Sequence, residues 1–385
     1  MAKVVHMTTV DMSVRHLLLN QLLALRAAGF EVGAVSADGP DLGPVRAAGV
    51  AHFPVSFTRR MTPLQDLKAA WQIWRLCRRE RFTIVHTHQV KAALFGQVAA
   101  RLAGVPIVVN TVHGFYFHEH TPPLKRQAWI LLERFCALFS DVLLSQNRED
   151  IGTAVESGIC QAGKIQHLGN GIDVRKFDRA SVPEDRLERL RSELGIPAGI
   201  PVVGFVGRLV AEKGLVEFFE AIAQLRKTHP DMRVLLVGPV DHDMPDCLGP
   251  EAAARAGIAD ITVFAGYRGD MPDLYALMSV LVLPSHREGL PRAPMEASAM
   301  GVPSVATAIR GCREVVRPGE NGYLVPVRDV AAIAGAIDRI LGDPAHAATL
   351  GLRARAIAVA EFDEQIVFGR VAATYRRLIA AKGLD

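Results

Sequence analysis

Short apolar runs alternate with amphipathic segments along the whole chain, and this alternation constrains the fold more than any other feature of the sequence. Strand-like runs lie at residues 4–8, 31–36, 84–86, 107–110, 142–145, 202–206, 233–237, 261–264, 280–284, 304–306 and 323–325. Helical patterns fall between them, for example at residues 14–27 and 64–79. Strands that alternate with helices in this way are typical of parallel sheets covered by helices on both faces. The sequence therefore predicts an α/β protein with doubly wound, Rossmann-like sheets.

The length of the chain predicts two domains. A chain of 385 residues exceeds what one ordinary hydrophobic core organises. The charged segment 177–201 ends in Gly-Ile-Pro-Ala-Gly-Ile-Pro, a composition that favours a linker. We expect an N-terminal domain over residues 1–180 and a C-terminal domain over residues 181–361. Apolar residues at helical spacing predict a final helix within residues 362–385.

Charge is shared unevenly between the two halves. Residues 1–180 hold 21 lysine and arginine residues against 14 acidic ones, whereas the remainder holds 23 against 26. A basic first half favours an anionic partner, such as a bilayer surface or a diphosphate-linked acceptor. Nothing in the sequence points to nucleic acid.

The sequence also bears on the cellular compartment. No run of eighteen apolar residues is free of charge, and the first residues have the pattern of a strand rather than of a signal peptide. Neither metal nor disulfide spacing relates the cysteines, which are Cys77, Cys136, Cys160, Cys247 and Cys312. This usage suits a reducing compartment. We expect a cytoplasmic protein, peripheral at most on the inner face of the plasma membrane.

Two carboxylates, Glu288 and Glu296, frame the most informative stretch of the sequence. Glu288 lies in a loop after the strand at 280–284, and Glu296 lies in a helix rich in alanine and methionine. The N–H groups at a helix N-terminus can bind a phosphate, and carboxylates accept hydrogen bonds from sugar or ribose hydroxyls. The stretch therefore predicts a sugar-nucleotide site. For Glu296 the alternative is a solvated helix face, which its apolar neighbours disfavour.

A second stretch places two cations beside glycines. Arg208 follows Gly207 at the end of the strand at 202–206, and Lys213 precedes Gly214 at the start of an amphipathic helix. Glycine allows close approach of a ligand to the backbone, and the two cations suit a diphosphate. A departing diphosphate gains negative charge, so fixed cations meet the main catalytic need without a metal ion. The alternatives are an ordinary surface loop and, for Arg208, a structural salt bridge.

Together these motifs resemble the signature of the retaining family-4 glycosyltransferases of the GT-B fold. The resemblance is carried by Gly207-Arg208-x4-Lys213-Gly214, Glu288-x7-Glu296, Gly169-Asn-Gly-Ile-Asp173, Gly266-Tyr-Arg-Gly-Asp270 and Gly322-Tyr-Leu-Val325. It covers nearly the whole chain and is similar to bacterial enzymes that extend polyprenyl-diphosphate-linked, capsular or other envelope glycans. It implies two Rossmann-like domains that face a cleft, with the final helix at about 362–385 packed back on the N-terminal domain. It also implies retaining hexosyl transfer from a nucleoside-diphosphate sugar, with UDP favoured by family frequency, to a glycan or lipid-linked acceptor hydroxyl.

The resemblance implies roles for residues of the C-terminal half. Glu296 would accept hydrogen bonds from the ribose hydroxyls. Glu288 would face the donor sugar, with the amides of Gly289 and Leu290 nearby. Tyr267 and Arg268 stand where relatives contact the base through backbone groups, although Arg268 is equally consistent with a solvated loop charge.

In the N-terminal half the resemblance singles out His113, which follows the strand at 107–110. It corresponds to a histidine at the interdomain cleft that touches the donor sugar or the acceptor, and a structural histidine is the alternative. Many relatives carry a glycine-rich turn after the first strand, whereas residues 8–13 of this chain contain no glycine. Close approach of a ligand to that loop is therefore not predicted.

We expect no metal and no other cofactor. His86 and His88 end a strand, but no third ligand has suitable spacing for zinc. His88 could contact the acceptor or pack in the core. The run Asp241-His-Asp243 mimics the metal motif of the other glycosyltransferase fold and is interpreted as a polar loop.

Two segments combine arginines with aromatic residues, at 57–61 and 71–79. They predict an interfacial surface for reaching a lipid-linked acceptor, with core packing of Trp71 and Trp74 as the alternative. Three rival functions stay open: a GT-B sugar-nucleotide epimerase, a nicotinamide dehydrogenase and a non-catalytic glycan or membrane binder. The dehydrogenase is disfavoured because no Gly-x-Gly-x-x-Gly follows the first strand.

Overall fold

The computed structural model describes residues 1–58, 62–118, 121–240 and 244–384. The chain divides into two compact units, Met1–Gly169 with Gln365–Asp385, and Asn170–Glu364. The first unit therefore ends before the expected boundary at residue 180, and it is completed by the last helix of the chain. Asp241-His-Asp243 and part of the segment 57–61 lie outside the described residues.

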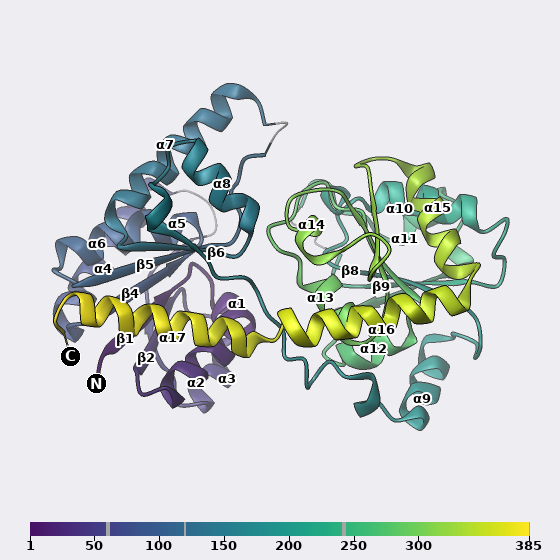
Figure 1. Cartoon of the computed structure of the whole chain (residues 1–385), viewed down its shortest axis with the longest axis horizontal. Coiled ribbons are helices and arrows are strands. Elements are labelled where there is room, and N and C mark those ends of the chain that lie inside the picture. The colour runs from purple at the N-terminus through teal and green to yellow at the C-terminus, as the bar shows by residue number, and fades with distance from the viewer. Residues whose placement is uncertain (59–61, 119–120, 241–243, 385) are drawn as a thin grey trace. The chain divides into compact units, whose positions relative to one another are not determined.

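The first unit contains a seven-stranded parallel sheet with the order β3-β2-β1-β4-β5-β6-β7 (Figure 1). Its strands are β1 (Lys3–Met7), β2 (Glu31–Ser36), β3 (Ala51–Pro54), β4 (Ile84–His88), β5 (Ile107–Val112), β6 (Val142–Ser145) and β7 (Ile165–His167). The sequence did not predict β3 and β7. Both are short strands at the sheet edges, and their partly exposed residues give no apolar run.

Helices cover both faces of this sheet. They are α1 (Asp11–Ser13), α2 (Leu19–Ala27), α3 (Leu42–Ala47), α4 (Pro63–Glu80), α5 (Val90–Ala92), α6 (Val98–Leu102), α7 (Pro123–Phe139), α8 (Arg148–Glu156) and α17 (Glu364–Ala381), with π-helical turns at Val14–Leu18 and Ala93–Gln97. The helix predicted at 14–27 is thus interrupted by a π turn, a feature that is frequent at functional sites. Successive strand residues face opposite sides of a sheet. Val4 accordingly packs in one core with residues of α2 and α17, and Val5 packs in another with residues of α4 and α6.

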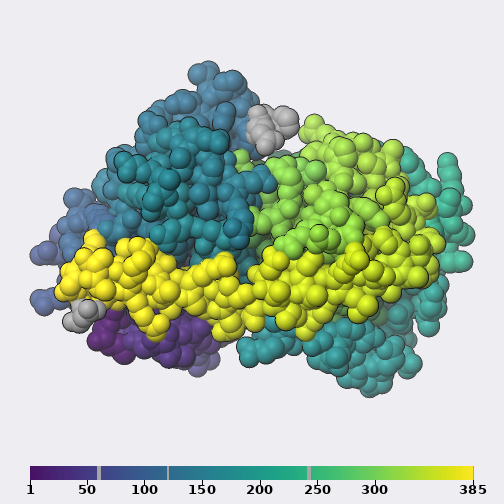
Figure 2. All heavy atoms as spheres, in the orientation of Figure 1, coloured from purple at the N-terminus to yellow at the C-terminus, as the bar shows by residue number. Residues whose placement is uncertain are grey.

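Helix α17 lies along the sheet of the first unit (Figure 1). Val371 and Tyr375 are fully buried in the core beneath it. Figure 2 shows that the outer side of this helix stays at the surface. Among the described residues, no helix is long and apolar enough to cross a membrane.

The second unit contains a six-stranded parallel sheet with the order β10-β9-β8-β11-β12-β13. Its strands are β8 (Val202–Val206), β9 (Arg233–Val237), β10 (Thr262–Gly266), β11 (Val280–Leu283), β12 (Ser304–Thr307) and β13 (Gly322–Val325). Its helices are α9 (Glu184–Leu194), α10 (Leu215–Leu225), α11 (Pro250–Arg255), α12 (Met271–Leu277), α13 (Arg292–Ala299), α14 (Cys312–Val315), α15 (Val330–Leu341) and α16 (Pro344–Glu361). The predicted doubly wound α/β class is confirmed for both sheets.

The segment expected to be a linker, residues 177–201, is an integral part of the second unit. Helix α9 occupies its middle, and Leu187, Leu190 and Ile196 are buried in the core of that unit. The linker prediction was wrong because the segment is charged on one helix face only. Gly195, at φ 64°, ends the helix in a left-handed conformation, which is the usual place for glycine after a helix.

Candidate active site

Each sheet reverses its strand order once, between β1 and β4 in the first unit and between β8 and β11 in the second. In open α/β sheets, ligands bind outside the carboxyl ends of the strands at such a switch point. The predicted residues follow these strands: Gly207, Arg208 and Lys213 come after β8, and Glu288 comes after β11. In the first unit, His88 ends β4 and His113 follows β5.

Gly214 brings the loop after β8 close to the end of β11. It has φ 73°, and a β-carbon added there would approach the carbonyl oxygen of Pro284 to 2.0 Å. Glycine is therefore the one residue that fits this conformation and this contact. As a result, Lys213 lies beside the residues that follow Pro284.

Lys213 and Glu288 form an ion pair within this edge, with 2.7 Å between Nζ and Oε1. The Ser285 hydroxyl donates to the same oxygen over 2.7 Å, and the Thr307 hydroxyl donates to the Ser285 carbonyl over 2.5 Å. The side chains of Lys213 and Glu288 are 20% and 11% exposed, so both remain accessible to a ligand. The structure thus brings together two residues that the sequence placed about seventy positions apart.

A hydrogen bond and an ion pair fix the loop that carries Glu288. His286 Nε2 lies 2.9 Å from Glu217 Oε1, and an Arg287 nitrogen lies 3.1 Å from Glu212 Oε1. Each contact joins the loop to the start of α10 or to the turn before it. The sequence did not predict these contacts because the spacing between the partners carries no local pattern.

Glu296 is held from two sides in α13. The Tyr275 hydroxyl donates to Oε2 over 3.0 Å, and Arg292 Nε lies 3.6 Å from Oε1. Burial raises the pKa of Glu296 above its ordinary value, while Arg292 and Tyr275 oppose that rise. The side chain is 14% exposed, so the solvated helix face considered for it is wrong. A ligand hydroxyl could donate a hydrogen bond to Oε1, the oxygen next to Arg292.

The backbone between the two acids is tightly fitted. Asn170 Nδ2 donates to the Leu290 carbonyl over 3.3 Å. A β-carbon on Gly311, which has φ 81°, would approach the Gly289 carbonyl to 2.0 Å. Gly289 and Leu290 therefore have a defined backbone position immediately before α13.

Tyr267 and Arg268 differ in their surroundings. Tyr267 is 71% exposed after β10. Arg268 forms hydrogen-bonded ion pairs with Asp270 and with Glu193 of α9, and these pairs raise its pKa. The interpretation of Arg268 as a solvated loop charge is therefore wrong, because its guanidinium is engaged by two carboxylates. Arg208 is exposed in the loop that follows β8.

A cluster of histidines lies toward the carboxyl ends of β1 and β4 in the first sheet. His6, His86 and His88 are buried, and one ring nitrogen from each lies within 4.8 Å of the others. The expectation that His86 and His88 lack a third partner is therefore wrong, because parallel pairing places His6 of β1 directly beside His86 of β4. His113 joins the cluster, with its Nε2 3.0 Å from His88 Nδ1.

Burial keeps these imidazoles neutral. It lowers the pKa of His6 to about 3 and that of His113 to about 4, where a hydrogen bond to Gln146 opposes the shift. The pKa values of His86 and His88 also fall well below the usual range, first through burial and then through the neighbouring histidines. No carboxylate contributes to either shift.

The glycine-free first loop is braced by Gln89, which follows β4. Gln89 Oε1 accepts from the Thr9 hydroxyl over 2.7 Å, and Gln89 Nε2 donates to the Ser13 hydroxyl over 3.2 Å. Gln89 has φ 69°, an uncommon conformation for a residue with a side chain. Such strain concentrates at functional sites. Because Gln89 directly follows His88, this loop lies at the same end of the sheet as the histidines.

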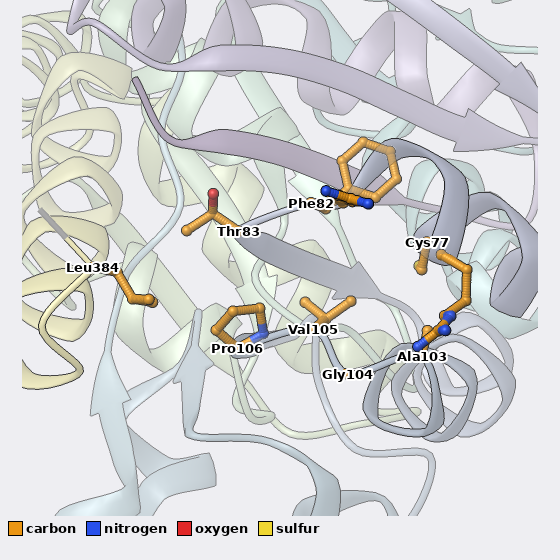
Figure 3. Close-up of a pocket in the computed structure, with 10 residues that line it drawn as sticks. Cys77, Phe82, Thr83, Ala103, Gly104, Val105, Pro106 and Leu384 are labelled. Atoms are coloured by element: carbon orange, nitrogen blue, oxygen red, sulfur yellow. The ribbon is translucent and has the colours of Figure 1, made fainter.

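An open hollow of about 420 Å³ lies at the opposite edge of the first sheet (Figure 3). Thr83 and Pro106 line it directly before β4 and β5, and Leu384 lines it from the C-terminal segment. Because it lies at the amino ends of the strands, it is separate from the switch-point edge.

Comparison with known proteins identifies the chain. A model of glycosyl transferase 4-like domains matches residues 14–171, and a model of group 1 glycosyl transferases matches residues 187–357. The chain is 30% identical over 295 residues to UDP-Gal:alpha-D-GlcNAc-diphosphoundecaprenol alpha-1,3-galactosyltransferase of Escherichia coli, covering 76% of this chain and 75% of that protein. It belongs to the family-4 glycosyltransferases of the GT-B fold.

Further relatives agree with this assignment. The capsular polysaccharide biosynthesis glycosyltransferase CapM of Staphylococcus aureus is 27% identical to this glycosyltransferase, over 98% of this chain and 97% of that protein. The crystal structure of Anabaena Alr3699/HepE in complex with UDP and glucose has a TM-score of 0.82 at 22% identity, over 98% of this chain and 100% of that one. The latter similarity shows the GT-B fold.

Proposed function

We propose that this glycosyltransferase moves a hexosyl group, with retention, from a UDP-sugar to a hydroxyl of a bacterial envelope, capsular or lipid-linked glycan. Support for the donor comes from the E. coli relative, whose name specifies UDP-galactose, and from the UDP complex of Anabaena HepE. Support for the acceptor class comes from the diphosphoundecaprenol acceptor of the former and the capsular role of CapM. An epimerase has no such support among the relatives named above.

The single observation that carries the proposal is the Lys213–Glu288 pair at the switch point of the second sheet. An ammonium has three donors, and the bond to Glu288 uses one of them. The remaining donors suit the oxygens of a diphosphate, and the exposed guanidinium of Arg208 supplies a second cation. As the bond to the sugar breaks, negative charge grows on the diphosphate, and these cations stabilise it.

The other donor contacts follow from the same edge. The Oε1 side of Glu296 would accept from the ribose hydroxyls, while Tyr275 fixes Oε2. The amides of Gly289 and Leu290, beside Glu288, would contact the donor sugar and its phosphate. Gly207 allows close approach of the backbone at the end of β8, and backbone groups of Tyr267 and Arg268 would contact the base.

We propose that the first unit supplies the acceptor side of the reaction. His113 would contact the donor sugar or the acceptor as a neutral imidazole, because burial lowers its pKa to about 4. We assign Glu288 no nucleophilic role, because Lys213 and Ser285 both donate to its Oε1. Retention then favours front-face displacement. In that step the acceptor oxygen forms the new bond on the face from which the diphosphate leaves, and the acceptor proton passes to the departing phosphate oxygen.

The surface of α4 supports contact with an anionic membrane at the cytoplasmic side. Four apolar residues spaced three and four positions apart form an exposed stripe: Leu64 (86% exposed), Leu67 (69%), Trp71 (54%) and Trp74 (39%). Arg75 lies over the Trp71 ring, 5.6 Å from its centroid. Core packing of the two tryptophans is therefore wrong. A basic helix with an exposed apolar face is typical of an interfacial element.

Thermal-shift measurements with UDP- and GDP-sugars test the donor assignment. A donor at about 100 times its Kd stabilises the protein by about 2.7 kcal/mol. The best UDP-sugar is then offered with a diphosphate-linked lipid acceptor, and NMR of the product gives the anomeric configuration. Exclusive stabilisation by GDP-sugars would overturn the UDP assignment, and inversion at the anomeric carbon would overturn the proposed mechanism.

A further inference from the structure

A continuous line of hydrogen bonds crosses the buried face of the first sheet and ends at His113. It starts at the Thr111 hydroxyl, 2.7 Å from His86 Nε2, and continues from His86 Nδ1 to the Tyr375 hydroxyl over 2.5 Å. The same hydroxyl lies 2.9 Å from His6 Nε2. The line then runs from His6 Nδ1 to His88 Nε2 over 2.9 Å.

The last links connect this line to the candidate active site. His88 Nδ1 lies 3.0 Å from His113 Nε2, and His113 is also hydrogen-bonded to the side chain of Gln146. The rings are close enough to stack, with 4.4 Å between the centroids of His86 and His88. We refer to Thr111, His86, Tyr375, His6, His88 and His113 as the histidine chain.

Strand geometry explains why these side chains meet. His6 pairs with His86, and His88 pairs with Thr111, so the four occupy neighbouring positions on three adjacent strands. His86 and His88 are two positions apart and therefore face the same side of the sheet. Helix α17 covers that side and inserts Tyr375, which is fully buried.

Proton counting shows that the histidine chain has a direction. A neutral imidazole has one donor nitrogen and one acceptor nitrogen, and a tyrosine hydroxyl can donate once while it accepts. Every link holds one proton, so setting the direction of one link sets the direction of all the others. We take the direction in which His113 donates to the Gln146 amide oxygen, and the rise that this bond causes in the pKa of His113 supports it. With that direction the proton lies on Nδ1 of every histidine in the histidine chain.

We propose that Tyr375, His6, His86 and His88 are positioning residues that hold His113 in its Nδ1–H form with its ring orientation fixed. This inference deepens the proposed function, on which the role of His113 depends. Through the histidine chain, helix α17, which lies far along the sequence, helps to position His113. Oriented supporting hydrogen bonds of this kind fix the tautomer of functional histidines elsewhere.

The distances favour a hydrogen-bonded chain over a metal centre. Histidine nitrogens bound to tetrahedral zinc at about 2.0–2.1 Å would lie about 3.3 Å apart. The nitrogens of His6 and His88 are 2.9 Å apart, which is an ordinary hydrogen-bond distance. Among the described residues, the groups whose charge acts on the pKa values of His86 and His88 are other histidines.

The test uses NMR of the full chain labelled with ¹⁵N-histidine, because long-range ¹H–¹⁵N correlations report which ring nitrogen carries the proton. In the wild type at pH 7 we expect His6, His86, His88 and His113 to be neutral with the proton on Nδ1. Tyr375→Phe removes the hydroxyl that joins His86 to His6. We expect mixed tautomers at His113 in this variant and a twofold to tenfold lower kcat, about the worth of one hydrogen bond.

A matched variant controls for the substitution itself. The Tyr323 hydroxyl bonds His346 Nε2 over 2.7 Å in the second unit, so Tyr323→Phe also removes a tyrosine–histidine bond. Its His113 signals and its kcat should equal those of the wild type. If Tyr375→Phe does not fold, Thr111→Val breaks the other end of the chain. Thr111→Ser keeps the hydroxyl and should restore the wild-type spectrum.

The outcomes separate this inference from the proposed function. A single Nδ1–H form at His113 in both Tyr375→Phe and Thr111→Val would overturn the inference. So would stoichiometric zinc in the purified protein that is lost in His6→Gln, because the cluster would then be a metal centre. The wild type could instead transfer no sugar and still show the expected tautomers, with Tyr375→Phe abolishing them. The inference about the histidine chain would then be supported, and the proposed function would be wrong.

Discussion

Lys213 and Glu288 meet at one oxygen atom, because the Lys213 ammonium and the Ser285 hydroxyl both donate to Glu288 Oε1 over 2.7 Å. This arrangement fixes the position of the ammonium close to the surface before any donor binds. A cation fixed in advance stabilises a developing negative charge without reorganising during the reaction. The pair therefore links the loop after β8 to the loop after β11 in structure and, as we propose, in catalysis.

Replacing Lys213 with methionine should lower kcat by about 10²–10³, the scale measured for the loss of one donor to a developing charge. The expected loss is in kcat more than in KM, because the charge on the diphosphate grows in the transition state. Steady-state kinetics with the preferred UDP-sugar measures both values. Lys227→Met, at an exposed site beyond α10, is the control and should keep wild-type activity. Full turnover in Lys213→Met would contradict the role of this cation.

Glu296→Gln should selectively weaken recognition of the ribose. A hydrogen bond to a charged group contributes about 1.5–3 kcal/mol, so UDP should bind about tenfold or more weakly to the variant. Calorimetric titration with UDP and with 2′,3′-dideoxy-UDP measures the effect of the hydroxyls in each protein. The analogue should bind less tightly than UDP to the wild type, and the difference should shrink in Glu296→Gln. An equal difference in both proteins would remove Glu296 from the ribose site.

Acidification should destabilise the first unit before the second. The pKa of His6 is about 3 in the folded protein and about 6.5 in an unfolded chain, so only the unfolded state takes up the proton between these values. Stability is therefore fully present above pH 6.5 and falls as the pH drops toward 3, by about 3 kcal/mol per such histidine at pH 4. Hydrogen exchange with mass spectrometry at several pH values, corrected for intrinsic rates, follows each unit separately. Equal acid sensitivity of β4 and β11 peptides would contradict this prediction.

Trp71→Glu combined with Trp74→Glu should abolish flotation with anionic liposomes. The double substitution places two charges in the exposed stripe of α4, where an interfacial helix buries apolar side chains. The control is Leu352→Glu, at a residue of α16 that is 76% exposed, which should float like the wild type. Binding of the wild type should weaken at high salt because the arginines act through screened charge. Wild-type protein that remains at the bottom of the gradient would remove the membrane proposal.

Treatment with EDTA should leave glycosyl transfer intact. In the proposed reaction Arg208 and Lys213 would supply the positive charge that a divalent ion supplies in metal-dependent transferases, so chelation would remove nothing that this reaction uses. Initial rates are compared before and after dialysis against the chelator, and then with added Mg²⁺ or Mn²⁺. Complete loss of activity that is restored by either ion would overturn the metal-free proposal.

Much of the second unit could be predicted from the sequence because its signals are local. The bounds of β8 and β9 are those predicted, since both are apolar runs that are buried except for one end residue. Lys213 and Glu288 were recognised for a similar reason, because each lies in a short motif in the segment that follows such a strand. Their mutual contact required the order of strands in the sheet, which no local pattern specifies.

The histidine chain is the feature that was least predictable from the sequence. His6 lies in a strand where a histidine has no evident purpose, and its partner Tyr375 is 369 positions away. A buried histidine within an apolar strand is a weak signal that polar partners must exist, because an unpaired buried polar group is costly. That signal gives the need for partners but not their identity, which comes from the parallel register and from the placement of α17.

The division of the chain has a consequence for its synthesis. The second unit, Asn170–Glu364, is contiguous, whereas the first needs residues from both ends of the chain. On the ribosome the second unit can therefore fold as soon as it emerges, while the earlier-made first unit waits for α17. Until α17 has emerged, the histidines of the first unit stay uncovered, so assembly of the half that is made first depends on the segment made after the second unit.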